Sequence, residues 1–113
     1  MDVEAQDIAR RAAGHLSGHF GTRIPADVEA ALHGSAGGPQ YLEPVAIALA
    51  TLVLNIAKFA WDIYKDNKKA ALSPPQADAV IRRIRLEVEV PAGVTSSQRD
   101  QIAAAVVSEL PPR

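Results

Sequence analysis

His15 and His19 are the residues of this chain whose types and spacing come closest to a chemical site. Two imidazoles four residues apart on one face of a helix can share a metal ion. The glutamate that zinc hydrolases carry beside the first histidine is absent, and Gly14 and Gly18 weaken the helix at this point. We interpret the pair as polar residues near a fraying helix end and expect no metal site.

No other residues form a recognisable catalytic arrangement. The serines lack the context of a nucleophile elbow, and the glycines of 34–38 have no lysine to complete a phosphate-binding loop. Glu87 and Glu89 lie beside Arg85, an arrangement typical of charged residues on a solvated surface or an interface and not of paired catalytic acids. The absence of cysteine excludes disulfides and thiol chemistry. We therefore expect a protein that is not an enzyme and needs no cofactor.

The elements that position these residues belong to a small chain with balanced charge. Its 113 residues are 48% apolar and 22% charged, with a formal net charge of −1. This composition indicates one domain over residues 1–113 and gives no electrostatic attraction for nucleic acid. The N-terminus resembles neither a secretory signal nor a transit peptide, so we expect the cytoplasm. Abundant alanine, with arginine exceeding lysine, is typical of GC-rich bacterial genomes.

The N-terminal part, residues 1–33, is expected to form two amphipathic helices. Apolar residues spaced three and four apart predict helices over 3–19 and about 25–33. The first is expected to fray after Ser17 because of its glycines, and Pro25 suits the first position of the second. The glycine-rich run 34–40 predicts a loop.

A long apolar helix is predicted at about 42–69, within the segment 41–69. Its seam follows a seven-residue repeat through Val45, Leu49, Leu52, Ile56, Phe59 and Ile63. A second row gathers most of the polar groups: Thr51, Asn55, Lys58, Asp62, Lys65 and Lys69. Apolar residues outside the seam indicate that this helix is covered over most of its circumference.

The last part, residues 73–113, predicts a helix, a strand and a helix. Ser73 and the two prolines after it suit a helix start at 74–82, and Thr95 with Gln98 suits a capping box before a helix at 97–110. Between them, strict alternation predicts a half-buried strand over 84–90, with Leu86 and Val88 toward the core. A helical alternative over 77–88 stays open, because Val80, Ile84 and Val88 are also spaced four apart.

A strand at 84–90 needs a partner for its backbone groups. The run 20–24 is the only other alternating segment of the chain, and it is short. Either these two segments pair, or a strand of another chain lies beside 84–90. The predicted fold class is thus α+β and mostly helical, with one or two short strands.

The segment 44–61 also suits a membrane. Val45 to Ala57 contains only Thr51 and Asn55 as polar residues, and extension to Trp61 approaches spanning length. The basic end at 65–69 would then face the cytoplasm, with the helix in the inner membrane. The polar row argues for burial in protein, because it keeps its register along the helix.

These patterns predict a non-enzymatic interaction or self-assembly module, a small adaptor or accessory subunit of bacterial type. We expect a homo-oligomer or a complex with a partner protein, and no nucleic acid. A small membrane protein whose 44–61 helix anchors it or forms a pore is the alternative. The predicted contact residues are Val45, Leu49, Leu52, Ile56, Phe59, Ile63, Leu86 and Val88.

Overall fold

The computed structural model describes residues 2–33, 44–69 and 76–110, and helices account for most of them. The helices in chain order are α1 (Val3–Phe20), α2 (Ile24–Leu32), α3 (Pro44–Lys69), α4 (Ala77–Glu87) and α5 (Ser96–Ser108). The glycine-rich run 34–40, the start of the predicted central helix at 41–43 and the predicted cap at Ser73 lie outside the described residues.

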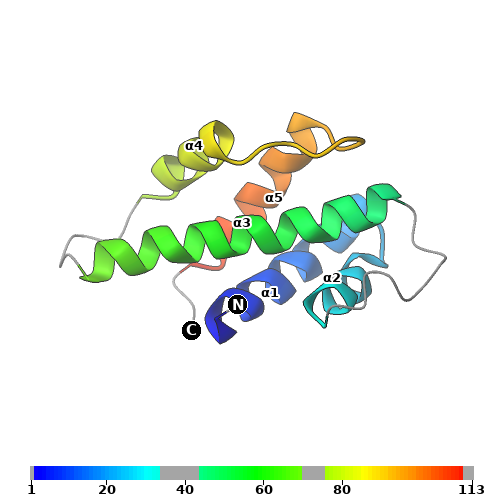
Figure 1. The fold of residues 1–113 in the computed structure, drawn as a ribbon, viewed down its shortest axis with the longest axis horizontal. Coiled ribbons are helices and arrows are strands. Elements are labelled where there is room, and N and C mark those ends of the chain that lie inside the picture. The colour runs from blue at the N-terminus through cyan, green and yellow to red at the C-terminus, as the bar shows by residue number, and fades with distance from the viewer. Residues whose placement is uncertain (1, 34–43, 70–75, 111–113) are drawn as a thin grey trace.

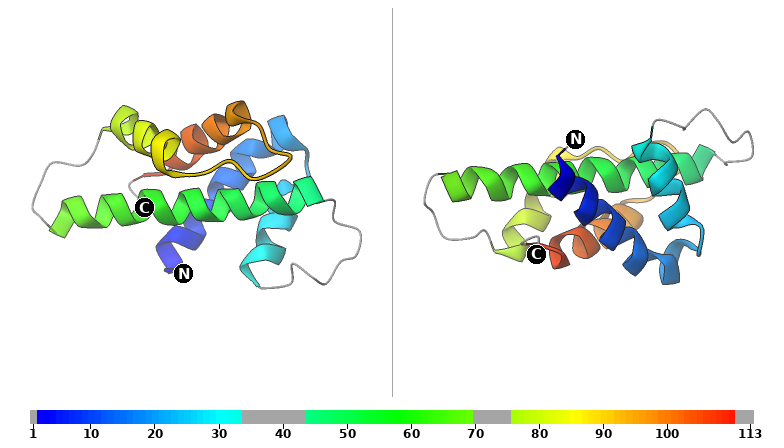
Figure 2. Two further views of the ribbon diagram at one scale, coloured as in Figure 1. Left: turned by 45° about the horizontal axis from the view of Figure 1, so that its top comes forward. Right: turned by 90° about the horizontal axis from the view of Figure 1, so that it is seen from below.

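The long helix α3 runs through the middle of the molecule (Figure 1). In the view of Figure 1, α1 and α2 lie below α3, and α4 and α5 lie above it. Figure 2 shows α1 crossing α3 obliquely. Helix α3 contacts all four other helices, and α5 sits between α1 and α4 and contacts both. Over the described residues, the molecule is thus a helical globule in which four shorter helices pack on the long helix α3.

The core is built where these helices meet α3. Helix α1 turns four alanines and two larger residues inward, and small side chains let neighbouring backbones approach closely. The largest fully buried side chains come from all five helices: Ile8, Leu16, Val28, Val53, Ile56, Val80, Ile84, Ile102 and Val106.

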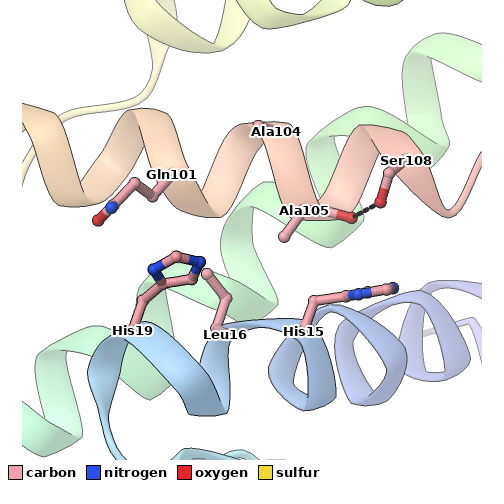
Figure 3. Close-up of a pocket in the computed structure, with 7 residues that line it drawn as sticks. All are labelled: His15, Leu16, His19, Gln101, Ala104, Ala105 and Ser108. Carbon is pink, nitrogen blue, oxygen red and sulfur yellow. Dashed lines mark hydrogen bonds between the residues drawn. The ribbon is translucent and has the colours of Figure 1, made fainter.

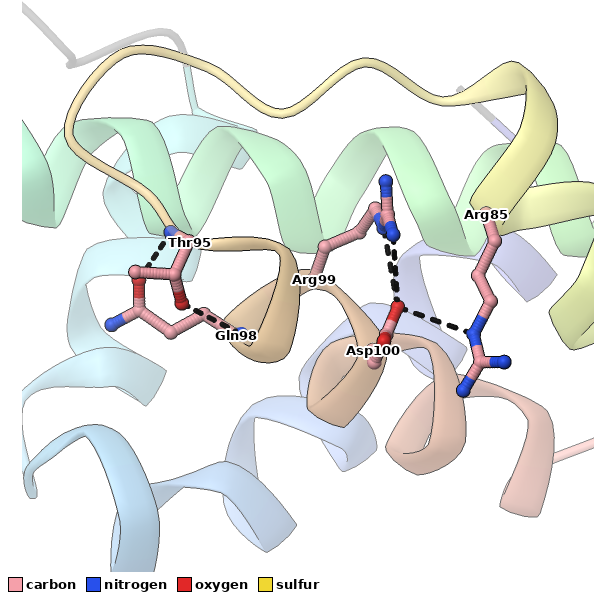
Figure 4. Close-up of polar contacts among 5 residues, drawn as sticks. All are labelled: Arg85, Thr95, Gln98, Arg99 and Asp100. Carbon is pink, nitrogen blue, oxygen red and sulfur yellow. Dashed lines mark hydrogen bonds and ion pairs between the residues drawn. The ribbon is translucent and has the colours of Figure 1, made fainter.

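Local signals in the sequence explain several helix ends. Gly21 ends α1 with a φ of 104°, a left-handed value that suits glycine. Pro25 stands in the first turn of α2, as predicted. The predicted capping box of α5 is present: the Gln98 backbone N–H donates to Thr95 Oγ1 at 3.0 Å, and the Thr95 N–H donates to Gln98 Oε1 at 2.9 Å (Figure 4).

The predicted strand at 84–90 is wrong. Residues from Ile84 to Glu87 form the last turn of α4, and Val88, Glu89 and Val90 follow without joining any sheet. Val80 and Ile84 are buried, whereas Leu86, expected to face the core, is 78% exposed. A helix forms here because it buries these two residues against α3 and α5 and satisfies the backbone hydrogen bonds within the segment. The Val88 N–H, for example, donates to the Ile84 carbonyl at 2.9 Å.

The second predicted strand, at 20–24, is also absent, which removes the partner that the first one needed. Phe20 is the last residue of α1, and Ile24 is the first residue of α2. Only a tight turn separates these two helices. The fold is accordingly all-helical over the described residues, and the predicted α+β class is corrected.

Helix α1 also differs from its predicted form. It continues through Gly14 and Gly18 to Phe20 and does not fray after Ser17. Leu16, between the two glycines, is 1% exposed. Tertiary packing of this turn compensates for the weak helix propensity of glycine, which is about 1 kcal/mol per residue relative to alanine.

Candidate functional site

The predicted contact seam of α3 lies mostly inside the chain's own core. Four of its members are between 0% and 7% exposed: Leu49, Leu52, Ile56 and Ile63. Phe59 is partly buried against this core, and Val45 is 38% exposed. The structure thus brings the seam together with the other helices and leaves little of it on the surface.

The polar row of α3 forms its solvent face. Thr51, Asn55 and Lys58 are exposed, and Asp62 and Lys65 are partly exposed. Among the described residues, one stretch is long and apolar enough to cross a membrane, Pro44–Asn67, with a mean hydropathy of 1.7. Of its most apolar 18-residue window, 39% is buried within the fold. The length and composition of this stretch are compatible with burial in protein and with insertion in a membrane.

The outer face of α4 carries an exposed leucine among arginines. Leu86 is flanked by Arg83, which donates to Glu87 at 2.9 Å and stacks over the Phe59 ring at 5.6 Å. Arg85 pairs with Asp100 of α5 at 3.4 Å, and the same carboxylate accepts from Arg99 at 3.2 Å (Figure 4). These pairs fix two of the arginines beside Leu86. Val88, the other predicted contact residue in this part, is half-buried against the core.

A pocket of about 400 Å³ lies between α1 and α5 (Figure 3). The described residues that line it are His15, Leu16, His19, Gln101, Ala104, Ala105 and Ser108. His19 points from α1 toward α5, near Gln101, whereas the His15 ring points along α1. The His15 Nε2 lies 2.7 Å from Oε1 of Glu109, just past the end of α5. The pocket is therefore lined by two imidazoles, the Gln101 amide, the Ser108 hydroxyl and three aliphatic side chains.

Ser108 contributes a hydroxyl group to the pocket. The Ser108 hydroxyl donates to the Ala105 carbonyl at 2.7 Å (Figure 3). No group of three or more histidine, aspartate or glutamate side chains could hold a metal ion as they stand in the described residues. His15 and Glu109 are the one acid–base pair at the pocket that the structure records.

Two charged clusters join α1 to its neighbours. The Asp2 carboxylate accepts hydrogen bonds from Lys65 Nζ at 2.7 Å and from Trp61 Nε1 at 3.0 Å. Both bonds lower the pKa of Asp2, and the bond from Lys65 has the larger effect. The same carboxylate raises the pKa of Lys65. On the other side of α1, Arg10 donates to Glu29 of α2, which lowers the pKa of Glu29 and raises that of Arg10.

Two of these features carried no sequence signal. Glu109 is 94 residues from His15, and Asp2 is 63 residues from Lys65. Neither pair belongs to a motif, so only the fold reveals them. No protein-family model matches the chain, and no curated protein or solved structure gives a significant match.

Proposed function

We propose that this chain is a small, non-enzymatic interaction module, an adaptor or accessory subunit in a bacterial cytoplasm, that assembles with a second copy of itself or a partner protein through the outer face of α4. The observation that carries the proposal is Leu86, whose 78% exposure is the highest of any large apolar side chain among the described residues. An exposed leucine side chain adds nothing to the stability of the fold, whereas its burial under a partner would stabilise the complex by about 2 kcal/mol.

The surroundings of Leu86 support the same surface. Arg83 is held by Glu87 and by the Phe59 ring, and Arg85 is held by Asp100. Pre-ordered arginines around an apolar side chain are typical of contact centres, because little side-chain entropy is lost on binding. The buried seam of α3 is left to its structural role, so Leu86 and the partly exposed Val45 are the predicted contact residues available to a partner.

The test is the mass of the full chain in solution by light scattering, without detergent. We expect a mass above the 12.0 kDa of one chain, which falls on Leu86→Glu while the helical circular dichroism spectrum stays that of the wild type. Val3→Glu is the matched control, because Val3 is another exposed aliphatic residue at 67% and lies on α1. A wild-type monomer that binds no partner, or equal losses in both variants, would contradict the proposal.

A second candidate is a membrane protein whose α3 inserts, with its 65–69 end toward the cytoplasm. The favouring observation is the 24-residue apolar stretch at 44–67. Trp61 and Tyr64, whose rings stack at 5.5 Å, lie near the basic end, and membrane-spanning helices are enriched in such aromatic residues at the interface. Insertion requires α3 to leave its four neighbours. Flotation of the chain with vesicles of anionic and neutral lipids separates the candidates: co-flotation that resists carbonate supports insertion, and protein left at the bottom contradicts it.

A further inference from the structure

We propose that two copies of this chain pair through the outer faces of their α4 helices, antiparallel about a two-fold axis at Leu86, with Arg82 of each copy against Glu89 of the other. The inference rests on the proposed α4 interface and names a second copy as its partner. It is carried by an exposed leucine that has a cation on one side and an anion on the other, neither of them paired within the described part of the chain.

Arg82 is the arginine of α4 that the fold leaves to a partner. It lies one helical turn before Leu86, so the two side chains share one face of the helix. Its side chain is exposed and forms no ion pair with the described residues, whereas Arg83 and Arg85 are held by carboxylates of the same chain. Asp78, a further turn away, lies in the first turn of α4, where a carboxylate interacts favourably with the helix dipole.

Glu89 supplies the opposite charge on the other side of Leu86. It follows α4 between Val88, whose backbone is extended, and Val90, and both valines are partly buried against the core. Because successive side chains of an extended segment point to opposite sides, Glu89 is turned outward, and it is exposed. Its carboxylate forms no ion pair within residues 2–33, 44–69 and 76–110.

A two-fold axis at Leu86 makes this arrangement self-complementary. In an antiparallel pair, a residue before the axis in one copy faces a residue after the axis in the other. Arg82 lies four residues before Leu86 and Glu89 lies three residues after it, so opposite charges meet on both sides while the two leucines meet at the centre. Burial of the leucines supplies affinity, and the charges set the register and direction. A parallel pair would place each charge against its like.

The test follows the mass of the full chain by light scattering over a series of protein concentrations, because an interface of one short helix gives a dimer that depends on concentration. We expect the wild type to approach twice 12.0 kDa. Arg82→Glu and Glu89→Arg should each raise the dimer dissociation constant at least about tenfold, because like charges then face each other. Arg11→Glu and Glu4→Arg are the matched controls, since both residues are exposed on α1, unpaired among the described residues, and should leave the constant unchanged.

A mixture of the two charge-reversal variants gives the sharpest result. Arg82→Glu chains combined with Glu89→Arg chains restore opposite charges at both contacts, so we expect dimers at concentrations at which either variant alone is monomeric. A mixture that stays monomeric, or a mass that falls on Leu86→Glu but on neither charge reversal, would overturn the two-fold pairing and leave α4 as an interface of another geometry. A wild-type chain that is monomeric at every concentration would also overturn the pairing, whatever partner protein the α4 surface then binds.

Discussion

Helices α3 and α4 are both amphipathic, yet the fold holds them very differently. Helix α3 contacts every other helix and buries side chains along most of its length. Among the described helices, α4 contacts only α3 and α5, and its fully buried residues are Val80 and Ile84. The cooperative core is therefore centred on α3, whereas α4 is packed on it along one face and leaves its outer face exposed. Such elements open locally at a lower free energy than the whole domain.

The largest expected effect is the loss of a core side chain from α3. Ile56 is 0% exposed, and Ile56→Ala should lower the free energy of unfolding by roughly 3–5 kcal/mol, because a cavity forms in the core of the helix that contacts every other helix. Urea unfolding followed by circular dichroism measures this change.

Ile84→Ala is the matched substitution in α4, since Ile84 is also 0% exposed. We expect Ile84→Ala to lower the free energy of unfolding by about 2 kcal/mol, the low end for such truncations. A helix with only two fully buried residues can shift to fill the cavity. Hydrogen exchange should show the added opening confined to α4. Equal losses at Ile56 and Ile84, with hydrogen exchange rising throughout the chain, would mean that the two helices contribute equally to the cooperative core.

A smaller effect is expected where the segment between α4 and α5 touches α3. Gly93 has a φ of 86°, and a Cβ at this position would lie 3.0 Å from Val45 Cγ2. Gly93→Ala should therefore cost about 1–2 kcal/mol from the left-handed backbone and the close contact together. Gly18→Ala is the control: it lies within α1 with open space around it, and should stabilise by up to about 1 kcal/mol. Thermal unfolding of both variants checks the opposite signs.

The smallest effect concerns the surface cluster that ties α1 to α3. Because the folded-state pKa of Asp2 lies below its ordinary value of 3.8, its contribution is present above that pH and is lost as the pH falls through the folded value. The difference in thermal midpoint between wild type and Asp2→Asn should shrink from about pH 6 to about pH 2. Glu29 titrates in both proteins, so its contribution cancels. A difference independent of pH would mean that Asp2 acts only as the residue before α1.

The same two helices also mark where reasoning from the sequence succeeded and where it failed. The pattern of α3 repeats over many turns, so its apolar and polar rows have a single helical interpretation. The segment around Ile84 is short, and its apolar residues satisfy both an alternating and a four-residue spacing. A strand there needed a partner that the chain does not supply, and this requirement is not visible in local periodicity.

Local sequence patterns were enough to predict the helices α1, α2 and α5, the capping box of Thr95 and Gln98, and the division of α3 into an apolar and a polar side. Each of these features depends on residues within a few turns of one another. Tertiary structure alone decided that Ile84 faces the core and Leu86 the solvent, that the α3 seam is filled by the chain's own helices, and that Glu109 meets His15. These outcomes depend on contacts between residues far apart in the chain, where the free energy of burial and of ion pairing is decided by which surfaces meet.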